Sequence, residues 1–389
     1  MNDKPEEKGS GLVRFRLRRR RIRPEVLTIV VILSIGSVAL YVSDKRLERL
    51  LEREQARVEG LAELVEEADQ GSFSQADFEA ARAELEGVIS DTAERVRSLE
   101  ESAGARARVI DEAASSVLFI QGAYGFVDPD TGRPLRYFYG GSDRPIRLPD
   151  GRTQVTTGGD GPLVQIFYTG TAFVVTEDGL LITNRHVAFP WEFEQNAQFT
   201  LRAGFAADRR ALVGFLPGFE HPVVLEPVAA SDDADVAVLR ITEPAQPTAP
   251  GEAPFELPPP LPLSANVPDL GDEVVVMGYP AGVEALLARA DPMFAEGLLS
   301  RGPVTFWEVG EALAVGGYIH PLNTQGIVGQ VTEARIVYDA ETTSGGSGGP
   351  VVALDGTVVA VNTAVMSQFS GSNLGVPSRQ VRALLDSLR

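Results

Sequence analysis

From about residue 113 to residue 389 the chain is a series of short apolar runs separated by Gly, Pro and Asp turns, and this pattern restricts the fold more than any other feature. The runs are "SSVLFIQG", "TAFVVTEDGLLITN", "DVAVLRI", "DEVVVMGYPAG", "IVGQVTEARIVYD" and "PVVALDGTVVAVNTAV". Many short strands in succession predict an all-β antiparallel barrel or sandwich. Residues 242–263 are rich in proline, which has no N–H for a sheet, so we expect them to connect two β lobes. The final "SRQVRALLDSL" predicts a short closing helix.

The composition excludes several kinds of chemistry. The chain has no cysteine, so disulfides, thiolate metal sites and a cysteine nucleophile are excluded. It has three histidines, His186, His221 and His320, and any imidazole base must be one of them. The net charge of −19 argues against nucleic acid as a partner. We expect no metal ion and no cofactor.

The N-terminal region predicts a membrane anchor. Residues 1–25 hold nine Lys or Arg against four acidic residues, and residues 26–43, "VLTIVVILSIGSVALYVS", carry no charge. Eighteen residues of helix rise about 27 Å, and the bilayer hydrocarbon core is about 30 Å thick. Basic residues on the N-terminal flank favour a cytoplasmic tail (1–25), a single-pass anchor (26–43) and an extracytoplasmic remainder. A signal peptide cleaved after "SVA" is the alternative, but the helical pattern that continues directly favours a retained anchor.

Residues 44–112 have the pattern of a helical stalk. Two apolar stripes with three- and four-residue spacing are separated by "QGSFSQAD", where Ser74 with Asp77 can cap a second helix. The stripes comprise Leu47, Leu51, Val58, Leu61 and Val65, then Leu85, Ile89, Val96, Leu99, Ala103 and Ile110. Two interpretations stay open: an amphipathic hairpin that packs on its own chain, or a coiled coil that makes the protein a homo-oligomer.

The stretch "ETTSGGSGGPVV", residues 341–352, suggests a nucleophile. A Gly/Ser linker would continue as polar sequence, whereas this one runs directly into a predicted β-hairpin with an Asp-Gly turn. Glycines around a serine allow backbone N–H groups to point together at an oxyanion. We therefore interpret Ser347 as a nucleophile.

A serine nucleophile needs a base, and the base needs an orienting carboxylate. His186 stands at the end of the run "LLITNRHV", and Asp235 stands at the start of the run "DVAVLRI". We interpret Asp232 and Asp233 as solvated turn residues. His221 and His320 lack a comparable context and are expected in surface loops.

These segments together resemble the trypsin-like serine proteases, and more closely the HtrA-type branch. The resemblance covers about residues 113–389 with the order His, Asp, Ser. The matched motifs are Thr-Asn-x-His-Val at 183–187, Asp-x-Ala-Val-Leu at 235–239, Gly-Asp-x-Val to Gly-x-Pro at 271–280, Thr-Gln-Gly-Ile-Val at 324–328, Gly-x-Ser-Gly-Gly-Pro at 345–350 and Asn-Thr-Ala at 362–364, followed by "LGVPS".

The resemblance implies a fold and a set of roles. The fold would be an all-β, two-lobed, trypsin-like double β-barrel over residues 113–389. The implied roles are general base for His186, its orienter for Asp235, nucleophile for Ser347, oxyanion-hole N–H donors for Gly345 and Ser347, and substrate binding for Asn362, Thr363 and Ala364.

Three departures from the branch are expected to matter. Gly346 stands where the HtrA branch usually has Asn and the trypsin branch has Asp, which predicts a more mobile oxyanion loop that a partner could order. Residues 281–323 are longer than the usual loop and predict a lid, a regulatory loop or a decorated hairpin. We expect no PDZ domain after the closing helix. If the specificity-pocket floor lies where the trypsin branch has it, Glu341 would occupy it; a solvated loop carboxylate is the alternative.

The function implied is that of a membrane-anchored serine endopeptidase acting on polypeptides, with envelope proteins as the expected substrates. The alternative is a weakly active or inactive protease-like domain that serves as an anchored binding or scaffold module.

Overall fold

The computed structural model describes residues 75–141, 144–148, 151, 153–244, 255–300, 302–342, 345–365 and 373–388. The predicted tail, the predicted anchor and residues 44–74 of the predicted stalk lie outside the described residues. Among the helices that are described, none is both long enough and apolar enough to cross a bilayer. The chain divides into two compact units, residues 1–96 and 97–389.

The first described element is the helix α2, Gln75–Ala113, which corresponds to the predicted second helix of the stalk. Ile89 and Val96 of the predicted stripe are 59% and 48% exposed. Towards its C-terminal end the helix buries Val109 and Ala113 in the core of the second unit. The short 3₁₀ helix η1, Ala114–Ser116, leads from it into the first strand.

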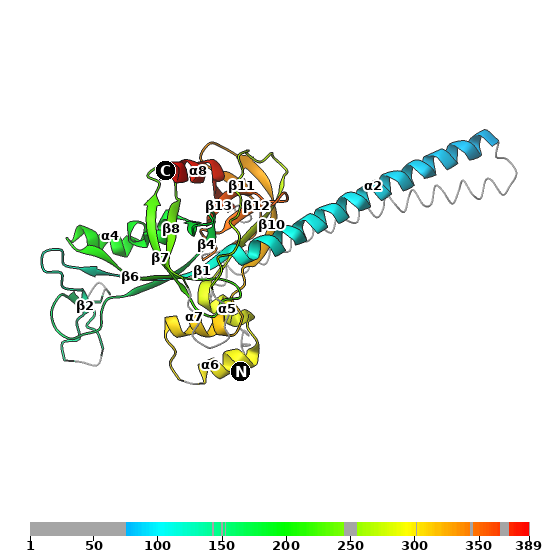
Figure 1. Cartoon of the computed structure of the whole chain (residues 1–389). Coiled ribbons are helices and arrows are strands. Elements are labelled where there is room, and N and C mark those ends of the chain that lie inside the picture. The colour runs from blue at the N-terminus through cyan, green and yellow to red at the C-terminus, as the bar shows by residue number, and fades with distance from the viewer. Residues whose placement is uncertain are drawn as a thin grey trace, which may run out of the picture. The chain divides into compact units, whose positions relative to one another are not determined.

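Six antiparallel strands close into a first barrel with the order β1-β4-β5-β8-β7-β6 (Figure 1). They are β1 Val117–Val127, β4 Ile166–Val174, β5 Leu180–Thr183, β6 Ala206–Phe215, β7 Val223–Ala230 and β8 Ala237–Glu243. A small hairpin, β2 Arg136–Tyr137 with β3 Val155–Thr156, lies in the connection between β1 and β4. The predicted runs did not include β6 and β7, because β6 contains "DRR" and β7 contains a proline and a glutamate.

A second closed barrel has the order β10-β11-β14-β13-β12-β9. Its strands are β9 Glu273–Gly278, β10 Leu322–Val331, β11 Ile336–Tyr338, β12 Pro350–Ala353, β13 Val358–Val365 and β14 Asn373–Pro377. The predicted closing helix is α8, Ser378–Asp386, which buries Val381. Two closed six-stranded barrels confirm the predicted two-lobed β architecture.

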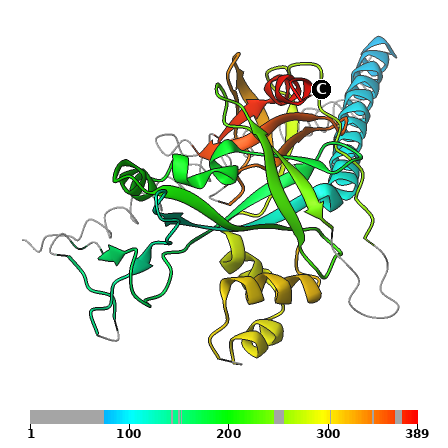
Figure 2. The same ribbon diagram turned by 60° about the vertical axis from the view of Figure 1, so that its left-hand side comes forward.

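Residues 281–321, between β9 and β10, form three helices rather than a simple hairpin (Figure 2). They are α5 Gly282–Arg289, α6 Pro292–Leu299 and α7 Phe306–Val315. Asp291 caps α6, and Thr305 with Glu308 forms a capping box on α7. We call α5 to α7 the helical insert.

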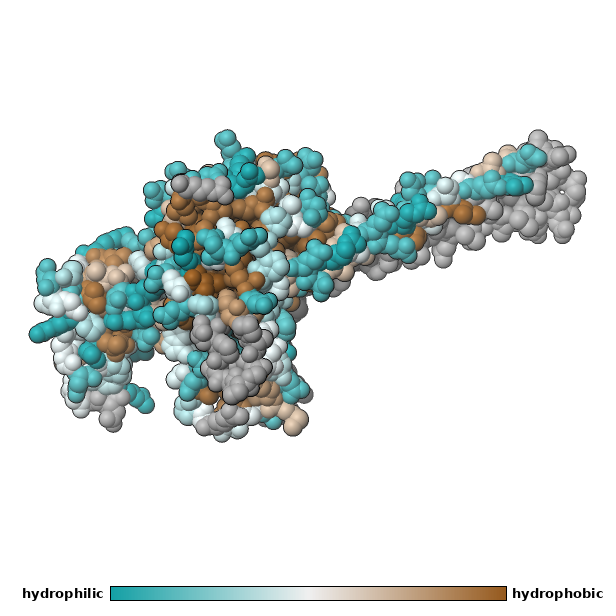
Figure 3. Space-filling model, in the orientation of Figure 1, coloured by the Kyte–Doolittle hydropathy of each residue, from teal (hydrophilic) through white to brown (hydrophobic). Residues whose placement is uncertain are grey.

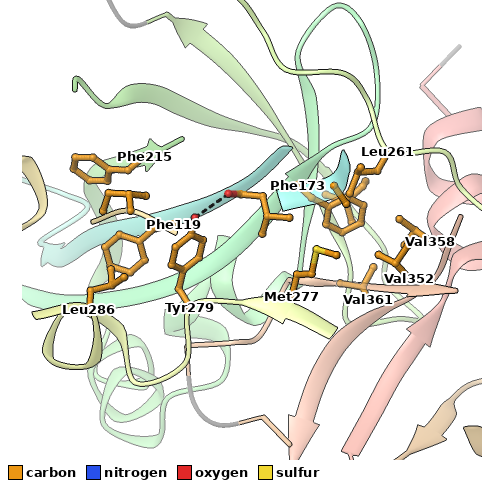
Figure 4. Packing of buried hydrophobic residues seen from close by; sticks show 14 of the residues in the cluster. Phe119, Phe173, Phe215, Leu261, Met277, Tyr279, Leu286, Val352, Val358 and Val361 are labelled. Atoms are coloured by element: carbon orange, nitrogen blue, oxygen red, sulfur yellow. Dashed lines mark hydrogen bonds between the residues drawn. The ribbon is translucent and has the colours of Figure 1, made fainter. Parts of the chain in front are cut away.

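The core between the two barrels is apolar and draws on both of them (Figure 4). Phe119, Phe173 and Phe215 come from the first barrel, and they share one buried cluster with Met277, Tyr279, Val352, Val358 and Val361. The Tyr279 hydroxyl donates to the backbone oxygen of Val117 over 3.0 Å, which ties the end of β9 to the start of β1. The barrels therefore pack through a continuous core, and the loops that carry the candidate site lie where they meet.

Candidate active site

His186 lies on α3, a one-turn helix over Arg185–Ala188 that follows directly from β5. Its imidazole Nδ1 is 2.7 Å from Oδ2 of Asp235, and its backbone N–H donates to Oδ1 of the same carboxylate over 3.0 Å. The Asn184 side-chain amide donates to the backbone oxygen of Asp235 over 2.7 Å. The structure thus joins the predicted base and the predicted orienter through both carboxylate oxygens.

The Asp235 carboxylate has a third partner on the other barrel. The Thr363 hydroxyl, on β13, donates to its Oδ2. Burial acts to raise the pKa of the Asp235 carboxyl, but the hydrogen bonds and charge of His186 and the Thr363 hydroxyl hold that pKa below its ordinary value. An ionised carboxylate at Nδ1 favours the tautomer in which Nε2 can accept a proton.

Arg185, which precedes the histidine, fastens α3 to the turn that leads to Asp235. Its guanidinium donates to the backbone oxygen of Ser231 (2.6 Å) and to Asp232 (3.0 Å), and it pairs with Glu192 (2.8 Å). Asp232 was expected to be a solvated turn residue, and its side chain is 95% exposed. Its pairing with Arg185 was not expected from the sequence.

A second arginine supports the C-terminal end of α3. Arg209, on β6, donates to the backbone oxygen of Ala188 over 2.5 Å. Its guanidinium carbon lies 5.2 Å and 5.1 Å from the ring centroids of Phe189 and Trp191, within cation–π range. Burial lowers the pKa of Arg209 although Tyr168 acts in the opposite direction. The sequence around Arg209 carries no signal for this contact, because only pairing in the barrel brings β6 to α3.

Ser347 lies in the turn before β12, between the two barrels. Its backbone oxygen accepts from the N–H of Thr171 over 2.9 Å, and its hydroxyl donates to the backbone oxygen of Thr363 over 3.1 Å. Gly348 has φ +90°, and a Cβ there would lie 2.1 Å from the backbone oxygen of Thr171. A Cβ on Gly349 would lie 2.0 Å from the backbone oxygen of Met277. These glycines are needed because the turn touches backbone from both barrels.

Gly345, the other predicted oxyanion-hole residue, is also held by the first barrel. Its carbonyl accepts from the Thr171 hydroxyl over 2.8 Å, and that hydroxyl accepts from the N–H of Tyr279 over 3.1 Å. Gly345 has φ +95°, and a Cβ there would lie 2.6 Å from the oxygen of Tyr279 and close to the start of the helical insert. Within the described residues, the N–H groups of Gly345 and Ser347 donate to no backbone oxygen.

Asn362, on β13, is 2% exposed and binds the nucleophile turn. Its amide donates to the backbone oxygen of Gly346 (2.8 Å) and to the Thr342 hydroxyl (3.2 Å), while its side-chain oxygen accepts from the Tyr338 hydroxyl (2.6 Å). These contacts give Asn362 a positioning role. The substrate-binding role of Asn362, Thr363 and Ala364 stays a prediction.

The remaining candidate residues lie elsewhere in the fold. His221 is in the connection between β6 and β7, and His320 is exposed in the connection between α7 and β10. The side chain of Glu341 is exposed, and its backbone oxygen accepts from the Thr324 hydroxyl over 2.7 Å.

Comparisons with known proteins find similar sequences over this part of the chain. Residues 170–361 match the family described as a trypsin-like peptidase domain. The chain is 31% identical over 218 residues to the serine protease HTRA2, mitochondrial, of Bos taurus, with 56% of this chain and 35% of that protein covered. It is 28% identical over 293 residues to a probable periplasmic serine endoprotease DegP-like of Rhizobium meliloti (strain 1021), with 73% and 46% covered.

The chain therefore spans about a third to a half of the length of these relatives. Among solved structures, the serine endoprotease from Yersinia pestis aligns with a TM-score of 0.41 and 15% identity, over 72% of this chain and 65% of that one. Residues 170–361 are thus similar to the trypsin-like peptidase domain family, and the relatives that match the chain are serine proteases of the HtrA and DegP type.

Proposed function

We propose that this chain is a serine endopeptidase that uses Ser347 as nucleophile, His186 as general base and Asp235 as the group that orients His186. The observation that supports this most is a connected set of hydrogen bonds. Asp235 binds the imidazole and the Thr363 hydroxyl, and the backbone oxygen of Thr363 accepts from Ser347. The three candidate residues thus belong to one network, although they come from different loops of two barrels.

In the reaction, the Ser347 hydroxyl turns from the Thr363 oxygen towards Nε2 of His186. As Oγ bonds to the carbonyl carbon of the scissile peptide, its proton passes to Nε2 and the carbonyl electron pair moves onto the oxygen. The N–H groups of Gly345 and Ser347 bind that oxyanion. When the tetrahedral species collapses, the C–N bond breaks, the leaving amine takes the proton from His186, and an ester remains on Ser347.

Water then attacks the ester, again giving its proton to His186. The second collapse returns this proton to Ser347 and releases the carboxylic acid product. Asp235 stays ionised throughout and stabilises the imidazolium that forms twice in each cycle. The fall of its pKa below the ordinary range is consistent with that role.

The first experiment is labelling with a fluorophosphonate, which reacts with an activated serine. We expect Ser347→Ala to abolish both labelling and peptide hydrolysis, a loss of about 10⁴-fold or more, with folding intact. His186→Ala should behave alike, and His221→Ala and His320→Ala are matched controls that should keep their activity. A comparable loss in either control, or labelling that survives Ser347→Ala, would refute these assignments.

The alternative of a catalytically weak scaffold rests on Gly346, which supplies no side chain to the oxyanion loop. A folded wild-type protein that neither reacts with the probe nor cleaves denatured casein would favour the scaffold alternative.

For location, we propose an anchored protein with its protease domain outside the cytoplasm, acting on envelope polypeptides. The basic cluster in 1–25 and the apolar stretch 26–43 support this topology. Alkaline phosphatase fused to the C-terminus should be active, because this reporter works only outside the cytoplasm. Activity of a reporter that works only in the cytoplasm would overturn the proposed topology.

A further inference from the structure

An exposed phenylalanine, Phe193, lies beside the candidate base. Phe193 is 53% exposed, and its ring centroid is 6.0 Å from that of His186, with the rings inclined at 72°. The His186 side chain is itself 30% exposed, so both rings face solvent at the same place. A large apolar side chain that remains exposed next to reacting groups is suited to bind an apolar ligand group.

The turn that carries this ring is well supported. It follows the 3₁₀ helix η2, Pro190–Glu192, and the N–H of Phe193 donates to the oxygen of Pro190 over 3.1 Å. Glu192 pairs with Arg185, and Gln198 donates to the backbone oxygens of Trp191 and Glu192, both over 3.1 Å. The backbone of this turn is therefore fixed before any substrate arrives, which reduces the entropy lost on binding.

The cation that supports α3 is not free to bind a ligand next to Phe193, because Arg185 pairs with both Glu192 and Asp232. The helix α4, Gln195–Arg202, follows Phe193. Figure 3 shows that apolar and polar surface lie side by side on the face drawn there. Consecutive Cα atoms are about 3.8 Å apart, so a peptide whose scissile carbonyl lies between Ser347 and His186 brings a flanking residue within reach of this ring.

We propose that Phe193 forms the wall of a substrate subsite beside His186 and selects an apolar side chain on a residue flanking the scissile bond. This inference rests on the proposed endopeptidase activity and adds its substrate class. Phe193 acts by contact with substrate and takes no part in the proton transfers. The sequence carries no signal for this position, because a phenylalanine in a turn has no motif of its own.

The test measures selectivity rather than activity alone. Cleavage sites of the wild-type enzyme in denatured casein, found by mass spectrometry, show which flanking position prefers apolar residues. Two fluorogenic peptides are then made that differ only there, one with Leu and one with Ser. We expect wild-type kcat/KM to favour the Leu peptide by at least about tenfold, the scale of one contact in an apolar pocket. Phe193→Ala should bring the ratio close to one, and Phe193→Leu should largely restore it.

Phe199→Ala is the matched control, because Phe199 is also exposed, at 61%, but pairs with Arg202 on α4. Its selectivity ratio should equal that of the wild type. An equal loss of kcat/KM for both peptides in Phe193→Ala would mean that the ring only supports His186, and would overturn the proposed subsite. An unchanged ratio of kcat/KM would overturn it as well. A wild-type enzyme that neither labels nor cleaves would instead refute the proposed function, and the subsite with it.

Discussion

The Asn362 amide on β13 donates to the carbonyl of Gly346, and this contact bears directly on the predicted oxyanion loop. Gly346 itself brings no side chain to the loop, and we expected greater mobility there. The Asn362 amide supplies a hydrogen bond from outside the loop, and the Tyr338 hydroxyl fixes that amide in turn. The position of the Ser347 N–H therefore depends on a side chain fifteen residues further along the chain.

We expect Asn362→Ala to lower kcat by roughly 10- to 100-fold with little change in KM, because small displacements of catalytic groups cost rate rather than ground-state binding. Steady-state kinetics on a short peptide would measure it. Tyr338→Phe, which keeps Asn362 but frees its side-chain oxygen, should give a smaller fall of the same kind. A rise in KM at constant kcat would assign Asn362 to substrate binding, as the family resemblance implies.

The Asp235 carboxylate predicts a pH dependence of stability. Its pKa is lower in the folded protein than its ordinary value, so the ionised form stabilises the fold above the unfolded-state pKa of about 3.9. This contribution is lost as the pH falls through the lower, folded-state pKa. We expect the free energy of unfolding of the wild type to fall more steeply below about pH 4 than that of Asp235→Asn. The same dependence of the free energy of unfolding on pH in the two proteins, measured by denaturation, would contradict this prediction.

At the scale of elements, the helical insert is attached to the first barrel through one face of α7. Gln121 of β1 is buried and donates to the backbone oxygen of Phe306 over 2.9 Å, and the rings of Phe306 and Phe167 are 4.9 Å apart. Gly310 lies on this face, where a Cβ would be 2.3 Å from the Gln121 side-chain oxygen. The insert also begins at Gly282, beside Gly345 of the predicted oxyanion loop.

A matched pair of glycines tests this attachment. Gly310→Ala should force the Gln121 amide away from Phe306 and lower stability by about 1–3 kcal/mol, the usual cost of overpacking. Gly297→Ala, in α6, meets nothing within 4 Å and should be neutral or stabilise by up to about 1 kcal/mol through helix propensity. Chemical denaturation and hydrogen exchange over 306–315 would compare the two variants. Equal behaviour would show that α7 does not pack tightly on β1.

For the whole molecule, the two barrels share a core in which Tyr279 is fully buried. Its ring packs 5.4 Å from that of Phe119, and its hydroxyl satisfies the Val117 carbonyl (Figure 4). We expect Tyr279→Phe to lower the free energy of unfolding by about 1–3 kcal/mol, because it leaves that carbonyl without a partner in the core. Urea denaturation would measure it. Tyr338→Phe is the comparison, since it removes an equally buried hydroxyl but should also reduce kcat through Asn362.

The sequence by itself determined the β-rich class, the division into two lobes and the candidate residues His186, Asp235 and Ser347, because strand patterning and short motifs are local properties of a chain. It did not reveal the helices of the insert, whose apolar residues were compatible with a hairpin. Only the tertiary structure decided the contacts of Arg209, Asn362 and Phe193. Each acts through a contact with a segment that barrel closure or a rigid turn brings close, and a contact of this kind has no signature in the residues around it.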